Sequence, residues 1–104
     1  MDVMLLYSPD CPNWRIAEER LRVALEQSGR GDVKIHLDEV LTIQHARETN
    51  FTGSPTILLD GVDPFDNPLA PPALACRVYR SAEGLGGSPT IEQLVDALEA
   101  ASGR

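Results

Sequence analysis

The chain has 104 residues, of which 42% are hydrophobic and 24% are charged, and this composition predicts a single soluble globular domain over residues 1–104. Nine basic and sixteen acidic residues give a formal net charge of −7, which disfavours nucleic acids and membrane surfaces as partners. The apolar run at the N-terminus is too short to span a membrane and follows no positive region. We therefore expect a cytoplasmic protein, with a monomer as the default state.

The first half of the chain predicts a strand, a helix and a second strand. Val3–Tyr7 is a short apolar run closed by Ser-Pro-Asp, as is typical of a buried strand. Apolar residues at helical spacing predict a helix over 14–28, with Pro12 in its first turn and Gly29 or Gly31 at its end. Alternation over 33–37 predicts a strand parallel to the first.

The second half predicts two helices and two strands around a proline-rich segment. In chain order we expect a helix over 42–49, a strand over 56–60, a loop over 61–74, a strand over 75–80, a glycine-rich turn over 81–89 and a final helix. Asn50 is suited to end the first of these helices in a left-handed conformation, with Phe51 packing behind it. Thr90 and Gln93 have capping-box spacing before the last helix, and residues 101–104 are expected to fray.

Chemistry is concentrated in Ser8-Pro9-Asp10-Cys11-Pro12-Asn13-Trp14, between the first strand and the first helix. The N-terminus of a helix carries a partial positive charge, which stabilises a thiolate, whereas the neighbouring Asp10 opposes it. Trp14 stands where a second cysteine would complete a Cys-x-x-Cys redox pair. The alternative for Cys11 is a small unreactive residue at a retired site, and the alternative for Trp14 is a core position.

The element order, with Cys-Pro-x-x before the first helix and Ser-Pro-Thr before the third strand, resembles the thioredoxin-like superfamily, and is closer to its small glutaredoxin-like members than to thioredoxin itself. The resemblance implies an α/β fold of βαβαββα order, with a central four-stranded mixed sheet (order 2-1-3-4) flanked by three helices. It implies that Cys11 is the nucleophile, that Pro12 belongs to the redox motif and that Pro55 is a cis-proline. The backbone of Ser54 would pair with a bound thiol or peptide, and Gly86-Gly87 would help to hold a glutathione carboxylate.

Because Trp14 replaces the resolving cysteine of this Cys-Pro-Asn-Trp motif, we expect a monothiol thiol-disulfide oxidoreductase. Cys11 would attack a disulfide, and a small external thiol would then release it. The catalytic residue is Cys11, and the substrate-binding residues are Pro12, Trp14, Ser54 and Pro55. We expect no metal and no cofactor, with glutathione or another low-molecular-weight thiol as co-substrate and a small thiol or a disulfide-containing protein as partner.

Cys76 is expected to be a buried or half-buried strand residue outside this chemistry, unless the 61–74 loop rearranges the sheet and makes it a redox partner of Cys11. On a fourth strand antiparallel to the third, it would lie about 13 Å along the strand from the site, at ~3.3 Å per residue, whereas pairing needs Cα atoms within roughly 7 Å. His36 and His45 are expected to be solvated, and the proline-rich loop to lie at the pole opposite the site. Two other functions remain open: a thioredoxin-fold binding module without turnover, and soft-metal handling through the Cys11 thiolate.

Overall fold

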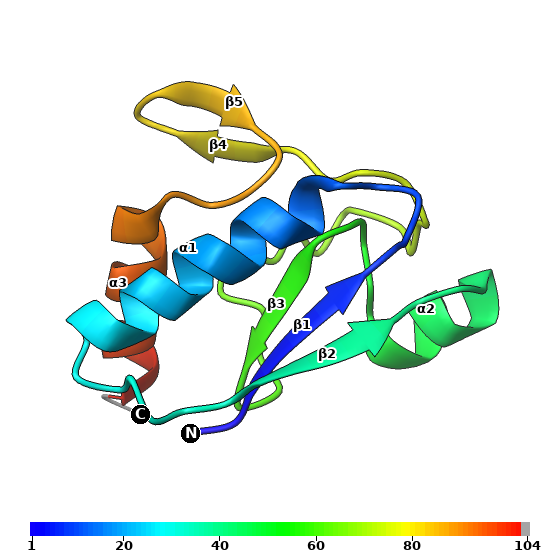
Figure 1. Cartoon of the computed structure of the whole chain (residues 1–104). Helices are drawn as coiled ribbons and strands as arrows, with labels where there is room; N and C mark the ends of the chain where they lie inside the picture. Colours follow the sequence, from blue (N-terminus) through cyan, green and yellow to red (C-terminus); the bar gives the residue numbers. More distant parts are fainter. Residues whose placement is uncertain (103–104) are drawn as a thin grey trace.

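The first strand of the chain is the centre of a three-stranded mixed sheet. In the computed structural model, which describes residues 1–102, β1 (Val3–Tyr7) pairs in parallel with β2 (Ile35–Glu39) and antiparallel with β3 (Thr56–Leu59). The strand order is therefore β2-β1-β3, and Leu5 faces Leu37 on one side and Ile57 on the other. The predicted parallel pairing of the first two strands is confirmed (Figure 1).

Two helices pack on one face of this sheet. The helix α1 (Asn13–Gln27) buries the predicted apolar stripe, and α3 (Ile91–Ser102) packs against both α1 and the sheet (Figure 1). The buried residues of α1 are Ala17, Leu21, Ala24 and Leu25. The predicted capping box begins α3, because Thr90 N–H donates to Gln93 Oε1 (2.9 Å) and Gln93 N–H donates to Thr90 Oγ1 (3.1 Å). After α1, Gly29 has φ +74°, as expected for a glycine that follows a helix.

The opposite face of the sheet carries a smaller cluster. The helix α2 (Ile43–Thr49) places Ala46 against Leu6, Val40 and Phe51, all of which are buried. The predicted end of this helix is confirmed, since Asn50 has φ 57° and Phe51 is 0% exposed.

The expected fourth strand of the sheet is absent from the described residues, and this correction changes the site. Residues 79–86 instead form a separate hairpin of β4 (Tyr79–Ser81) and β5 (Gly84–Gly86), which Figure 1 shows beyond α1 and away from the sheet. Cys76 makes only a single parallel bridge with Ser54, ahead of β3. The segment around Cys76 pairs with Ser54 and not with β3 itself. Its alternating residues therefore do not form a further strand of the sheet.

The proline-rich loop connects the two ends of the sheet. It leaves β3 through the Asp60-Gly61 turn, where Leu59 and Val62 exchange backbone hydrogen bonds of 2.8 and 3.1 Å. It then returns to the end of the sheet at which the site lies, where Ala73 N–H donates to the carbonyl of Phe51 at 3.2 Å. The expectation that the whole loop lies opposite the site is therefore wrong for its C-terminal end.

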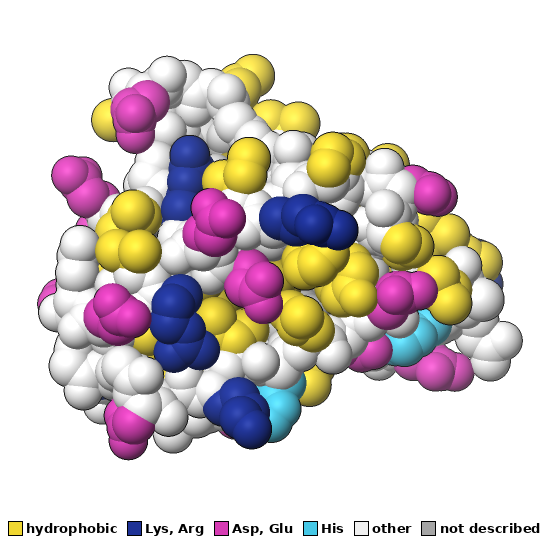
Figure 2. Space-filling model, in the orientation of Figure 1, with side chains coloured by type: hydrophobic (Ala, Val, Ile, Leu, Met, Phe, Trp, Pro, Cys, Tyr) yellow, Lys and Arg dark blue, Asp and Glu magenta, His cyan; other side chains and the backbone are white. Residues whose placement is uncertain are grey.

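The C-terminal end of the chain is only partly described. Ala101 and Ser102 belong to α3, and Ala101 is buried, whereas residues 103–104 of the segment expected to fray lie outside the described residues. No helix within residues 1–102 has the length and apolar character needed to cross a membrane. On the face that carries α1, Figure 2 shows acidic and basic side chains interspersed with apolar ones rather than gathered by sign.

Candidate functional site: the Cys11–Cys76 disulfide

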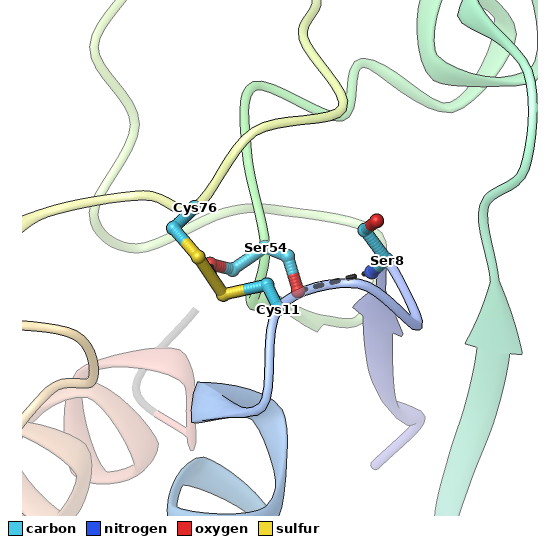
Figure 3. The surroundings of a disulfide bond; sticks show 4 residues. All are labelled: Ser8, Cys11, Ser54 and Cys76. Carbon is cyan, nitrogen blue, oxygen red and sulfur yellow. Dashed lines mark hydrogen bonds between the residues drawn. A yellow bond between two sulfur atoms is a disulfide. The ribbon is translucent and has the colours of Figure 1, made fainter.

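The two cysteines of the chain form one disulfide, which joins the β1–α1 junction to the segment before β4 (Figure 3). Their Cα atoms are 5.6 Å apart, in the usual range for a disulfide. The prediction that Cys76 is out of reach is therefore wrong. That prediction requires a strand antiparallel to β3, whereas Cys76 forms a parallel bridge with Ser54, just before β3 begins, and lies there beside Cys11.

Ser54 holds the Cys76 segment through its backbone. Ser54 N–H donates to the carbonyl of Ala75 at 2.9 Å, and Arg77 N–H donates to the carbonyl of Ser54 at 2.8 Å. Ser54 is fully buried, and its peptide bond to the buried Pro55 is cis, as expected. The backbone edge that the resemblance assigns to a bound thiol or peptide is thus occupied by residues 75–77 of the same chain.

The close approach of these two segments requires a glycine at position 53. Gly53 has φ +136°, and a Cβ atom there would lie 2.9 Å from Cβ of Arg77 and 3.3 Å from the carbonyl oxygen of Ala75. A side chain at this position would push the Cys76 segment away from Ser54. The sequence carries this signal only as a glycine before Ser-Pro, which is equally compatible with an ordinary turn.

Arg77 fixes the segment to the proline-rich loop. Its guanidinium donates to Asp63 Oδ2 at 2.7 Å, to Thr56 Oγ1 at 3.3 Å and to the carbonyl of Phe65. The side chains of Arg77 and Asp63 are only 9% and 5% exposed, so this ion pair is buried. Neither residue was among the predicted site residues, because their pairing depends on the path of the loop between them.

Two serines hold the Cys11 side of the disulfide, Ser8 through its backbone and Ser54 through its hydroxyl group. Cys11 N–H donates to the carbonyl of Ser8 at 3.1 Å, and Ser8 N–H donates to Ser54 Oγ at 3.0 Å (Figure 3). Cys11 Sγ lies 3.6 Å from the carbonyl oxygen of Ser54. The two cysteines differ in accessibility, because Cys11 is 2% exposed whereas Cys76 is exposed.

The helix that follows Cys11 begins without a neutralising side chain. Pro12 is its N-cap residue and makes no side-chain capping bond, and no acidic residue lies in the first turn of α1. The partial positive charge of this helix end is therefore not offset by an acidic side chain of its own first turn. A thiolate formed at Cys11 would be stabilised by this charge.

Trp14 packs against β1. Its ring stacks on Tyr7 with centroids 4.3 Å apart, and the Arg15 guanidinium lies 5.2 Å from the Trp14 ring centroid. Trp14 is half-buried, whereas the other members of its helical stripe are fully buried. Desolvation, followed by the hydrogen bond to Glu39, raises the pKa of Tyr7 above its ordinary value. The structure thus places Trp14 in an aromatic pair on the first turn of α1.

The other residues named in the sequence analysis are Gly86-Gly87 and the two histidines, His36 and His45. A Cβ atom added to Gly87 would clash with the Asn13 side chain, so the connection before α3 runs beside the start of α1. His36 is exposed, and His45 Nε2 lies 3.2 Å from Asp38 Oδ2. Within residues 1–102, no group of three or more His, Cys, Asp or Glu side chains is placed to hold a metal ion.

A cavity lies next to the segment that carries Cys76. It has a volume of about 380 Å³ and runs between the proline-rich loop and residues 77–80. Its lining residues are Thr52, Phe65, Asp66, Asn67, Ala70, Arg77, Val78, Tyr79 and Arg80. Arg77, which follows Cys76 and whose backbone N–H donates to the carbonyl of Ser54, is thus also part of the wall of this cavity.

The β1-α1-β2-α2-β3 order and the mixed sheet are partly thioredoxin-like, but the disulfide does not follow the Cys-x-x-Cys pattern. The second thiol comes instead from residue 76, far along the chain. Comparisons with family models, with curated proteins and with solved structures find no match for this chain. What is established is a small α/β domain whose two cysteines meet at the start of its first helix.

Proposed function

We propose that the protein is a thiol-disulfide oxidoreductase in which Cys11 and Cys76 form the redox pair. One observation carries this proposal: the two cysteines are joined at the strand–helix junction where the sequence predicts a reactive thiol. The external thiol of the expected monothiol mechanism is replaced by Cys76. Such a pair would open and close during turnover, which agrees with the expected cytoplasmic location because lasting structural disulfides are rare there.

The reaction exchanges two electrons and two protons with a partner. In one direction, two thiol groups of the partner reduce the Cys11–Cys76 disulfide, so that the protein becomes a dithiol and the partner a disulfide. In the other direction, the protein dithiol reduces a disulfide of the partner. The hydrogen bonds of Ser54 to Ala75 and Arg77 support this cycle, because they hold Cys76 near Cys11 without the covalent bond.

The test is the reduction of a peptide that contains one disulfide, with dithiothreitol as the final reductant. We expect the wild-type protein to accelerate peptide reduction, and we expect Cys11→Ser and Cys76→Ser each to abolish the acceleration. Activity that survives in Cys76→Ser and requires glutathione would instead support the monothiol mechanism through Cys11. A wild-type protein without activity would contradict the proposal.

A structural role is the second candidate, and the burial of Cys11 favours it. A disulfide with one sulfur shielded from solvent is less accessible to thiols, and in a binding module it would only hold residues 75–77 against Ser54. In that case both serine variants would lower the free energy of unfolding without affecting any thiol exchange, because the folded wild-type protein would not exchange at all.

A further inference from the structure

We propose that thiol exchange enters the disulfide at the sulfur of Cys76 and that Cys11 is the sulfur released. This inference rests on the proposed function and assigns the two cysteines unequal roles within it. It reverses the expectation from the sequence, in which Cys11 receives the partner.

Access favours Cys76. A thiolate attacks a disulfide sulfur in line with the bond that breaks, so the attacked sulfur must be reachable from the side opposite its partner. Cys11 is 2% exposed and lies against the carbonyl of Ser54, whereas Cys76 is exposed. The disulfide is therefore open to a partner thiol from the side of the exposed residue Cys76, whereas the protein shields Cys11.

The stability of the released thiolate favours the same direction. Cys11 precedes the N-terminus of α1, whose first turn contains no acidic residue. That helix end stabilises an anion, whereas the opposing carboxylate of Asp10 is exposed and its repulsion is screened by solvent. A more stable thiolate is the better leaving group. Cys76 lies in a segment outside any helix, between the proline-rich loop and β4, and has no helix end of its own.

Reduction of the disulfide takes two successive thiol exchanges. The partner thiolate forms a bond to Sγ of Cys76, the Cys11–Cys76 bond breaks, and its electron pair stays on Sγ of Cys11. A second thiol of the partner then attacks the partner sulfur of this mixed disulfide, so that the partner leaves as a disulfide and Cys76 becomes a thiolate. Protons from the two partner thiols complete the dithiol.

The backbone hydrogen bonds of the two residues that flank Cys76 also favour a competing reaction, in which the disulfide closes again. While the partner is attached, Ser54 still holds Ala75 and Arg77, so Cys76 stays close to the Cys11 thiolate. Attack of Cys11 on Sγ of Cys76 then expels the partner and closes the disulfide again. A mixed disulfide on Cys76 is therefore short-lived and has to be trapped rapidly.

The experiment traps the first intermediate in the folded, oxidised wild-type protein. The protein is mixed briefly with cysteamine and quenched with acid. Free thiols are then blocked with N-ethylmaleimide in mildly acidic denaturant, and the chain is digested with pepsin for peptide mass mapping. We expect about tenfold more cysteamine on Cys76 than on Cys11, with N-ethylmaleimide on Cys11, because both access and leaving-group stability favour this direction.

The matched control is the same protein mixed with cysteamine in denaturant, where the fold no longer distinguishes the sulfurs and both should carry the adduct. Cysteamine mainly on Cys11 in the folded protein would overturn the inference and leave the proposed redox pair standing. Adducts that form in denaturant but never in the folded protein would overturn the proposed function and the inference together.

Discussion

Gly53 lets two backbone segments touch at the site. The positive φ of this residue and the 2.9 Å that would separate its Cβ from Cβ of Arg77 both exclude a side chain there. The close contact lets the carbonyl of Ala75 and the N–H of Arg77 form hydrogen bonds with the backbone of Ser54. Cys76 lies between these two residues in the chain. The absence of a side chain at position 53 is thus one condition for the two cysteines to meet.

Replacing Gly53 by alanine should lower the free energy of unfolding of the oxidised protein by about 1–3 kcal/mol, the usual cost of a strained backbone position. The clash with Arg77 should add to this cost. Gly61→Ala is the matched control, since Gly61 also has a positive φ but a Cβ there would meet no atom within 4 Å. Urea unfolding measures both variants, and equal losses would show that the contact with Arg77 is unimportant.

The buried pair of Arg77 and Asp63 is the second residue-scale feature. Removing Arg77 leaves the Asp63 carboxylate buried without its cation, so Arg77→Met should destabilise the protein by about 3–5 kcal/mol. The double variant Asp63→Leu with Arg77→Met removes both charges and should recover most of that loss. Thermal and urea unfolding compare the variants. A double variant no more stable than Arg77→Met would refute the view that the unpaired carboxylate causes the loss.

At the scale of elements, Tyr79 attaches the β4–β5 hairpin to the residues that lead into β3. It is buried at the start of β4, donates its hydroxyl to the carbonyl of Pro55, and meets the ring of Phe65 edge-on at 5.6 Å. Burial raises the pKa of Tyr79 above its ordinary value of 10.0, and the nearby Arg77 offsets only part of this effect. The hairpin is thus attached through a phenol that has to stay protonated.

Stability should therefore fall at alkaline pH. Above pH ~10 Tyr79 loses its proton in the unfolded chain but keeps it in the folded protein. The contribution of Tyr79 to the free energy of unfolding is therefore complete below pH ~10 and declines as the pH rises above that value. Tyr79→Phe should be less stable at neutral pH by about 1 kcal/mol, for the lost hydrogen bond, and should show a smaller alkaline decline. Urea unfolding at several pH values measures both. An unchanged decline in Tyr79→Phe would contradict this role.

Some elements follow from sequence pattern, and others depend on distant contacts. The β1 strand is a short apolar run, and α1 and α3 have apolar residues at helical spacing. Local residues such as Asn50, Thr90 and Gln93 mark the ends of elements. The alternation of residues 75–80 fits an added sheet strand equally well. What prevents that strand is the bonding of Ser54 to Ala75 and Arg77, which no local pattern contains.

At the scale of the whole molecule, the path of the proline-rich loop determines the site. The position of Cys11 follows from the strand–helix junction, but the position of Cys76 depends on where the chain returns after residue 74. That return depends on Gly53 and on the pairing of Asp63, near the start of the loop, with Arg77, beyond its end. The sequence could therefore locate one sulfur of the site but not its partner.

The disulfide should contribute strongly to global stability, because it closes 65 residues of chain. Restricting an unfolded chain over a loop of this length stabilises a protein by about 4 kcal/mol. In urea unfolding, we expect the free energy of unfolding of the oxidised protein to be higher than that of the Cys11→Ser/Cys76→Ser double variant by about this amount. Equal stabilities would mean that the fold holds these segments together without help from the bond.

The central claim is that the disulfide exchanges with thiols while the protein stays folded. Its most direct test is to equilibrate the protein with mixtures of reduced and oxidised dithiothreitol and to determine the oxidised fraction by alkylation and mass spectrometry. We predict that the same fraction is reached from the oxidised and the reduced protein, at a rate unchanged by urea below the unfolding transition. A reduction rate that rises with urea in parallel with the rate of global unfolding would contradict the claim.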